Sequence, residues 1–303
     1  MTIRIRSTTL AATLLASASL IACNSQSPAS EPTPGPALWR VSDADTTIYL
    51  YGLPNMMDAD TSWRNDVFEE ALNEAGTVIL EADRTSPEAQ AAIQQAIPQF
   101  GVYRDGRTLS GVLDEETRAQ VETVTASMGV PLQALDPLRP WLAANQIGSL
   151  AMQHNGLTNT ETPTVVISAA VSEAGKDLAY FEEPTAFLAA VGGLPEDSQM
   201  RMFHQALDLV QNDPEQPQRV LSQWAAGDVS ALAQTFHGEG EWPDETVRAV
   251  ILLERNATWK MRLEEIMDTE TGVYFVAVGI GHLVGEDSLI VALGGAGYEV
   301  ARQ

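Results

Sequence analysis

Two segments near opposite ends of the chain share one pattern, and this pattern narrows the folds open to the chain. Residues 48–55 read IYLYGLPN, and residues 275–282 read FVAVGIGH. Each is an apolar, β-prone run that leads into Gly-x-x-polar, where glycine lets the backbone bend tightly as it leaves a strand. Because sites in α/β proteins gather at the carboxyl ends of strands, Asn55 and His282 are predicted to lie at one sheet edge. The turn glycines of this pattern are Gly52, Gly279 and Gly281.

A third polar group follows the same logic. Residues 77–82 read TVILEA, a β-branched run that carries Glu81 near its end. A carboxylate at the end of an apolar strand favours a functional role over a purely structural one. If the three strands are neighbours, Asn55, Glu81 and His282 converge on one pocket.

The rest of the chain is predicted to be mainly helical. Helical patterns cover residues 62–75, 114–128, 137–153, 163–174, 184–191, 196–210, 217–225 and 245–267. Strand patterns cover residues 39–41, 46–53, 77–82, 177–181, 272–278 and 298–301. We therefore predict an α/β (α+β) fold with a small sheet built from N- and C-terminal strands and a long, mainly helical middle section. Glu182 and Glu183, after the middle strand, are predicted to be solvated.

The N-terminus predicts export and a lipid anchor. Residues 1–22 carry Arg4 and Arg6 before an uncharged apolar stretch that is short for a membrane span. The stretch ends in Leu-Ile-Ala-Cys, which resembles a bacterial lipobox, so Cys23 is expected to be acylated and attached to a membrane. Residues 23–38 then form the acylated cysteine and a flexible tether, and residues 39–303 the folded domain. Asn24 favours the outer membrane; the alternative is an ordinary secreted protein with a stray cysteine.

Charge and cysteine content exclude several classes of function. The formal net charge is −24, from 17 basic and 41 acidic side chains. Nucleic-acid binding is not expected, because phosphates require clustered cations. The single cysteine excludes a disulfide and a cysteine-based zinc site. The glycines from Gly279 to Gly285 imitate a dinucleotide turn, but the chain ends too soon for the rest of that fold, so no nucleotide cofactor is expected.

Several segments also resemble one known family in the same order along the chain. They are IYLYGLPN (48–55), VILEAD (78–83), LRPWLAAN (138–145), AYFEEP (179–184), LLERNATW (252–259) and FVAVGIGHLVGEDSL (275–289). From about Trp39 to the C-terminus the chain resembles the TraB/GumN family, which is related to the Tiki metalloproteases. The resemblance implies hydrolysis of a peptide or protein with a divalent metal such as manganese, zinc or cobalt. It also implies a site of two Gly-x-x-His motifs, a glutamate and an arginine.

Three of these four positions match. His282 stands at the second histidine, Glu81 at the glutamate and Arg255 at the arginine, which implies catalytic roles for all three. Asn55 stands where the first histidine belongs. The implied metal ligands are therefore His282, Glu81 and Asn55, and an amide oxygen is a weaker ligand than imidazole for zinc or manganese.

This departure leaves three interpretations open: an impaired pseudoenzyme, an enzyme with an altered metal, or metal-free acid–base chemistry by Glu81 and His282. The first hypothesis for function is a metal-dependent, peptidase-like hydrolase in the cell envelope. The alternative is a non-catalytic module that binds a ligand or protein there. Structural roles also remain open, with His282 capping its turn and Arg255 pairing with Glu81 or Glu254. The other histidines, His154, His204 and His237, lack metal-ligand spacing.

Overall fold

The computed structural model describes residues 35–303, which lie within one compact unit, Pro32–Gln303. Within these described residues, no helix is long and apolar enough to cross a membrane. The predicted signal peptide, Cys23 and most of the tether lie outside the described residues, so those predictions stay predictions.

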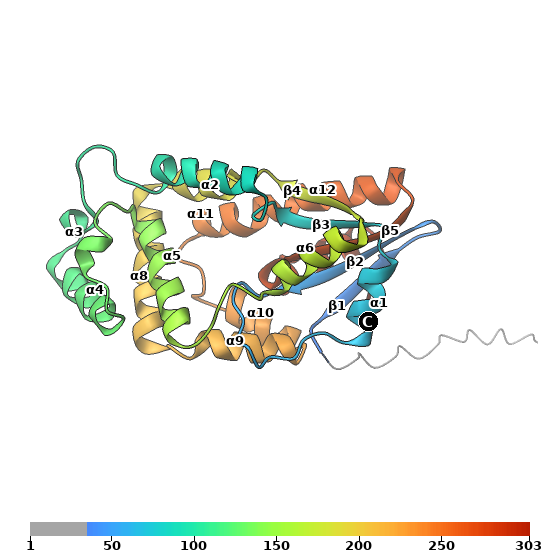
Figure 1. Cartoon of the computed structure of the whole chain (residues 1–303), viewed down its shortest axis with the longest axis horizontal. Coiled ribbons are helices and arrows are strands. Elements are labelled where there is room, and N and C mark those ends of the chain that lie inside the picture. The colour runs from blue at the N-terminus through green and yellow to red at the C-terminus, as the bar shows by residue number, and fades with distance from the viewer. Residues whose placement is uncertain (1–34) are drawn as a thin grey trace, which may run out of the picture. The chain divides into compact units, whose positions relative to one another are not determined.

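Six strands form one mixed sheet in the order β4-β3-β5-β2-β1-β6 (Figure 1). They are β1 (Leu38–Ser42), β2 (Thr46–Leu53), β3 (Thr77–Ala82), β4 (Asp177–Glu182), β5 (Gly272–Gly279) and β6 (Val300–Arg302). The first four strands in this order run parallel, and β1 and β6 follow at the other side with antiparallel pairing. Because β5 lies between β2 and β3, the carboxyl ends of these three strands meet at one edge. The predicted α/β fold is confirmed.

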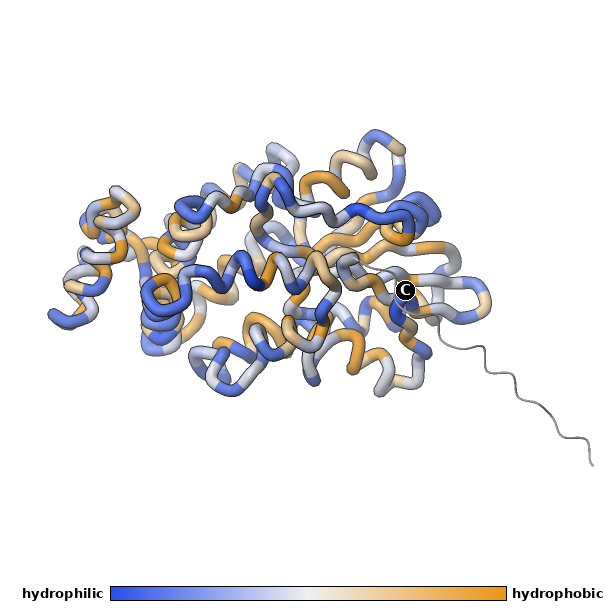
Figure 2. Tube along the Cα trace, turned by 90° about the horizontal axis from the view of Figure 1, so that it is seen from below, coloured by the Kyte–Doolittle hydropathy of each residue, from blue (hydrophilic) through white to orange (hydrophobic). Residues whose placement is uncertain are grey.

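The middle of the sheet is an apolar layer covered on both faces. Residues Phe275 to Val278 of β5 have no exposed surface, as expected for a parallel strand with both faces covered. Tyr51 of β2 packs against the rings of Phe68 in α1 (Asp66–Glu74) and Trp224 in α9 (Gln216–Ala225). Figure 2 shows hydrophobic residues gathered along the strands and polar residues in the outer helical turns.

The helices follow the predicted pattern with a few differences. Besides α1 and α9, the α-helices of the described residues are α2 (Pro87–Phe100), α3 (Leu109–Val112), α4 (Glu115–Ser127), α5 (Pro140–His154), α6 (Pro163–Ala174), α7 (Ala186–Gly192), α8 (Glu196–Asn212), α10 (Val229–His237), α11 (Glu245–Arg248), α12 (Glu254–Thr269) and α13 (Leu289–Gly295). Helix α1 starts later than predicted because Asn65 caps it by accepting from the Phe68 N–H at 2.9 Å. Helix α10 was not predicted, although Asp228 caps it in the same way.

The predicted long helix over residues 245–267 is interrupted. Between α11 and α12 the chain makes a π-helical turn, η2 (Ala249–Leu253). Such turns are rare and often mark functional sites. Here the turn ends at Leu253, one residue before Glu254 and Arg255 begin α12, so it sets which residues of α12 face the sheet edge.

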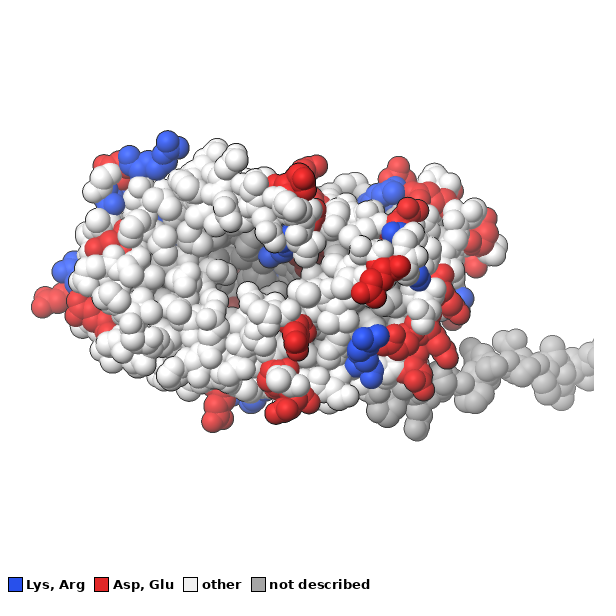
Figure 3. Space-filling model, viewed as in Figure 1, with Lys and Arg blue, Asp and Glu red and all other residues white. Residues whose placement is uncertain are grey.

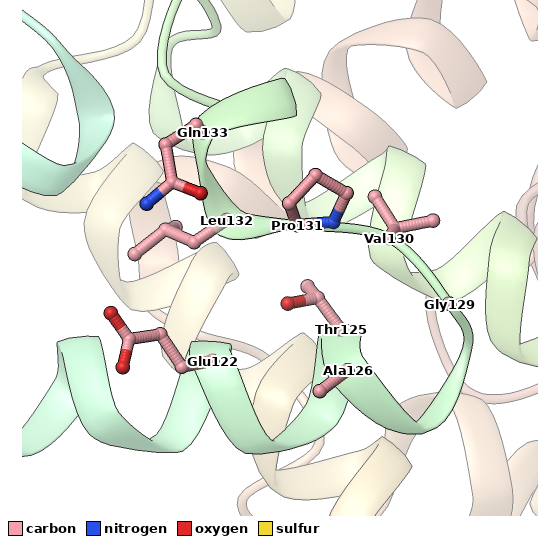
Figure 4. A pocket seen from close by; sticks show the side chains of 8 residues that line it. All are labelled: Glu122, Thr125, Ala126, Gly129, Val130, Pro131, Leu132 and Gln133. Atoms are coloured by element: carbon pink, nitrogen blue, oxygen red, sulfur yellow. The ribbon is translucent and has the colours of Figure 1, made fainter.

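A second core lies away from the sheet, where α4, α5 and α8 pack together. Figure 4 shows a shallow pocket there, between α4 and the loop at residues 129–133. Its walls are mainly apolar, and the Thr125 side chain lies among them (Figure 4). This pocket is separate from the residues at the strand ends.

Candidate functional site

Four side chains from four separate elements meet at the carboxyl edge of the sheet. They are Glu81 of β3, Glu182 of β4, Arg255 of α12 and His282 of the short 3₁₀ turn η3 (Ile280–His282). The side chains of Glu81, Glu182 and Arg255 are only 18%, 13% and 12% exposed. Three of the four, Glu81, Arg255 and His282, are residues that the sequence singled out, and the fold brings them together.

Arg255 is the centre of this cluster. Its Nη2 donates to Glu81 Oε2 at 2.7 Å and to Glu182 Oε2 at 3.2 Å, and its Nε donates to Glu182 Oε1 at 2.7 Å. The guanidinium also lies over the rings of Trp259, at 4.6 Å, and Phe187, at 5.5 Å. The cation is therefore held by two carboxylates and two aromatic faces, an arrangement that suits a planar guanidinium better than an ammonium.

Glu182 corrects one sequence prediction. It was expected to be solvated, but besides Arg255 it accepts a hydrogen bond from Trp259 Nε1 at 3.0 Å. The reason is the pairing of β4 with β3, which places Glu182 opposite Ala82 and beside the end of the strand that carries Glu81. Glu183, the next residue, lies just beyond the end of β4 and is exposed. The sequence offered two adjacent glutamates without showing which one faces inward.

His282 is buried, and its partners fix its tautomer. Nδ1 is 2.7 Å from Asn256 Oδ1, and Nε2 is 3.0 Å from Arg255 Nη1. Asn256 donates through its Nδ2 to the Asp287 carbonyl at 2.9 Å, so its Oδ1 faces the histidine. An amide oxygen only accepts and a guanidinium only donates, so the proton lies on Nδ1 and the Nε2 lone pair faces Arg255.

Two of the three turn glycines, Gly52 and Gly279, are needed for space rather than for unusual backbone angles. None of the three, Gly52, Gly279 and Gly281, has a positive φ. A Cβ on Gly52 would lie 2.3 Å from Ile280 Cδ1, and one on Gly279 would lie 3.1 Å from Glu81 Oε1. The Gly279 N–H also donates to Glu81 Oε1 at 2.6 Å. Gly52 and Gly279 therefore let β2, η3 and the Glu81 side chain approach closely.

Asn55 does not join the cluster. It lies two residues beyond Leu53, which pairs with Gly279, so it is near the same edge, but its side chain is exposed. In the part of the chain that the structure describes, no hydrogen bond connects Asn55 with Glu81, Arg255 or His282.

His237 has a place beside the site that its sequence spacing did not indicate. Its Nε2 donates to the Gly281 carbonyl at 2.8 Å, and its ring stacks on Trp242 at 5.8 Å. It therefore supports the turn that carries His282. Only the unpredicted helix α10 explains how it reaches that turn.

With this geometry in hand, comparison with known proteins identifies the family. The model of the TraB/PrgY/gumN family matches residues 37–302, which include every strand and all four clustered residues. This chain belongs to the TraB/PrgY/gumN family. No curated protein and no solved structure matches the chain. The family match covers nearly all of the described domain, as the ordered resemblance of the six segments predicted.

The protonation states within this TraB-family site follow from its contacts. Burial lowers the pKa of His282 to about 4. Burial alone would raise the pKa of Glu81, but Arg255 and the Gly279 N–H outweigh it and hold that pKa below its usual range. At neutral pH Glu81 is therefore a carboxylate and His282 a neutral imidazole, both beside the Arg255 guanidinium. Because the pKa of His282 is lowered on folding, its contribution to stability is complete above pH 6.5 and is lost as pH falls towards 4.

The donor atoms in this arrangement do not fit a divalent metal. The Nε2 lone pair of His282 and one oxygen of Glu81 are both directed at Arg255, and the other Glu81 oxygen accepts from Gly279. Across residues 35–303, no three His, Cys, Asp or Glu side chains are grouped so that they could hold a metal ion. The guanidinium already supplies the positive charge that a metal would bring.

A hollow opens beside the strand ends. It is visible in Figure 3, which has the same view as Figure 1, in the region bordered by α5, α6, α10 and α11. The carboxyl ends of the strands point towards it (Figure 1). Its walls are mostly uncharged, while acidic side chains outnumber basic ones on the surrounding surface (Figure 3).

Proposed function

We propose that this TraB-family protein is an exported lipoprotein, anchored in the outer membrane through Cys23, whose domain binds a peptide or protein segment without catalysis. The observation that carries the proposal is the closed hydrogen-bond network of Glu81, Arg255 and His282. The lipobox-like sequence at residues 20–23 supports the anchor.

A hydrolytic site needs a base with a free lone pair near the water that it activates. Both oxygens of Glu81 accept hydrogen bonds, and Nε2 of His282 accepts from Arg255. An oxyanion needs a donor that is free to meet it. Nε, Nη1 and Nη2 of Arg255 all donate within the protein, where Nη1 also reaches the Ile251 carbonyl at 3.4 Å. None of the three groups is therefore free for chemistry in this arrangement.

The charge of the protein favours a basic partner. A formal charge of −24 attracts cationic segments and repels acidic ones at low ionic strength. The uncharged walls of the hollow suit the apolar and backbone parts of such a segment, while the acidic surroundings suit its lysine or arginine side chains (Figure 3).

One observation supports a second candidate, a metal-dependent hydrolase. Glu81, Arg255 and His282 come from distant parts of the sequence and nevertheless meet at the sheet edge, as they would in an active site. For a metal to bind, Glu81 and His282 would first have to separate from Arg255.

A hydrolysis assay decides between the two candidates. The full chain in mild detergent is incubated with casein and a peptide library, with MnCl₂, CoCl₂ or ZnCl₂, and the products are read by mass spectrometry. We expect no more cleavage than in the matched variants Glu81→Gln and His282→Gln. Cleavage by the wild type that both substitutions abolish would establish the hydrolase and refute the proposal.

A further inference from the structure

We propose that the shallow pocket between α4 and the loop at residues 129–133 binds the guanidinium of an arginine side chain that a basic partner segment presents. This pocket lies outside the strand-end cluster, so the inference goes beyond the proposed function. The observation that carries it is the buried, unpaired hydroxyl of Thr125, which lines the pocket beside the free carboxylate of Glu122.

The hydroxyl of Thr125 is the unusual feature of this pocket. Thr125 is 1% exposed, and its Oγ1 has no hydrogen-bond partner among the described residues. Several other helical threonines donate to a carbonyl of their own helix: Thr123 donates to Ala119 at 2.9 Å, and Thr235 and Thr258 make the same bond at 3.0 Å. The Thr125 hydroxyl is instead turned into the pocket (Figure 4). A buried hydroxyl without a partner costs free energy, and a ligand that bonds to it removes that cost.

The charge beside this hydroxyl is negative. Glu122 lies three residues before Thr125, on the same face of α4, and is exposed. The segment 114–136, which forms the pocket, carries five acidic side chains and one basic side chain, that of Arg118. Arg118 donates its Nη2 to the carbonyls of Ser110 and Leu113. The pocket therefore favours a cationic ligand over a neutral or acidic one.

An arginine side chain suits both the polar groups and the walls. Its planar guanidinium carries five N–H donors, so it can pair with the Glu122 carboxylate and donate to the Thr125 hydroxyl together. Its apolar stem suits the walls formed by Ala126, Val130 and Pro131. Because Thr125 Oγ1 is covered in the ligand-free structure, the loop at residues 129–133 has to shift as the guanidinium enters.

The test titrates the full chain, in mild detergent, with N-acetyl-arginine methylamide. The chain is labelled with ¹⁵N-glycine, because Gly129 lines the pocket, and Gly129→Asn assigns its signal. We expect the arginine derivative to shift this signal saturably. The matching citrulline derivative, which has nearly the same shape without the charge, should bind ~10-fold or more weakly. Equal binding of both probes would overturn the inference, because the pocket would then not recognise the cation.

The variant Thr125→Val separates a ligand-binding role from a structural one. Valine keeps the shape and removes the unpaired hydroxyl, so the melting temperature should rise while the arginine derivative binds ~10-fold more weakly. Glu122→Gln should weaken binding by a similar factor. Thr123→Val is the matched control and should leave binding unchanged, since the Thr123 hydroxyl is bonded within the helix. A lower melting temperature for Thr125→Val would overturn the inference, because the hydroxyl would then have a structural partner.

The remaining outcomes separate this inference from the proposed function. If the Gly129 signal does not respond to the arginine derivative, the inference is wrong and the non-catalytic function is unaffected. If the wild type cleaves peptides in the hydrolysis assay and the Gly129 signal responds as expected, the proposed function fails and this inference stands.

Discussion

Replacing Arg255 with methionine, in the absence of added metal, is expected to lower the free energy of unfolding by about 3–5 kcal/mol. The reason is that the variant leaves Glu81 and Glu182 as a mostly buried carboxylate pair without a cation, and breaking one partner of a buried ion cluster costs this much. The measurement is urea unfolding of the full chain at pH 7, followed by fluorescence.

A second substitution should recover part of that loss. Arg255→Met combined with Glu182→Gln removes one charge of each sign, so the double variant should be more stable than Arg255→Met alone. Arg262→Met is the matched control, since its ion pairs with Glu265 and Glu270 are exposed and such pairs contribute about 0–1 kcal/mol. Equal losses for Arg255→Met and Arg262→Met would show that the cluster is not held by Arg255.

Replacing Gly52 with alanine should destabilise the domain by about 1–3 kcal/mol, the usual cost of overpacking a core. The new Cβ would lie 2.3 Å from Cδ1 of the buried Ile280, the first residue of the turn that carries His282. The same unfolding experiment measures the change. Alanine at Gly148, inside α5, meets no atom within 4 Å and should be neutral or stabilising.

The clash at Gly52 can be tested by relieving it. Ile280→Val removes the Cδ1 atom, so Gly52→Ala should cost less in an Ile280→Val background than in the wild type. If Gly52→Ala lowers the free energy of unfolding equally in both backgrounds, the close approach to Ile280 does not explain the need for glycine. The backbone freedom of Gly52 would then be the explanation.

Much of the fold could be predicted because its signals are local. The strands at residues 46–53, 77–82 and 272–278 are short apolar runs, and each is present at nearly the predicted place. The pairing of strands is not a local property. That β5 lies between β2 and β3 had to be assumed from the sequence, and the structure supplies it.

Part of the site could likewise be predicted from the sequence, and part could not. Glu81, Arg255 and His282 could be named because they match the family motifs, and all three meet. Glu182 was missed because its position depends on the pairing of β4 with β3, which places it beside the end of the strand that carries Glu81. Asn256 and His237 were missed because their contacts depend on the π-helical turn η2 and on helix α10, and neither was predicted.

Arg255 faces a neutral His282 at the centre of the cluster, and the titration of that imidazole tests this arrangement most directly. The full chain is labelled with ¹⁵N-histidine, His282→Gln assigns the signal, and spectra are recorded from pH 5 to pH 8. We expect His282 to keep its proton on Nδ1 across this range, because burial lowers its pKa to about 4. A His282 that gains a proton near pH 6.5, its ordinary value, would show that Nε2 is free of Arg255 and would contradict the account.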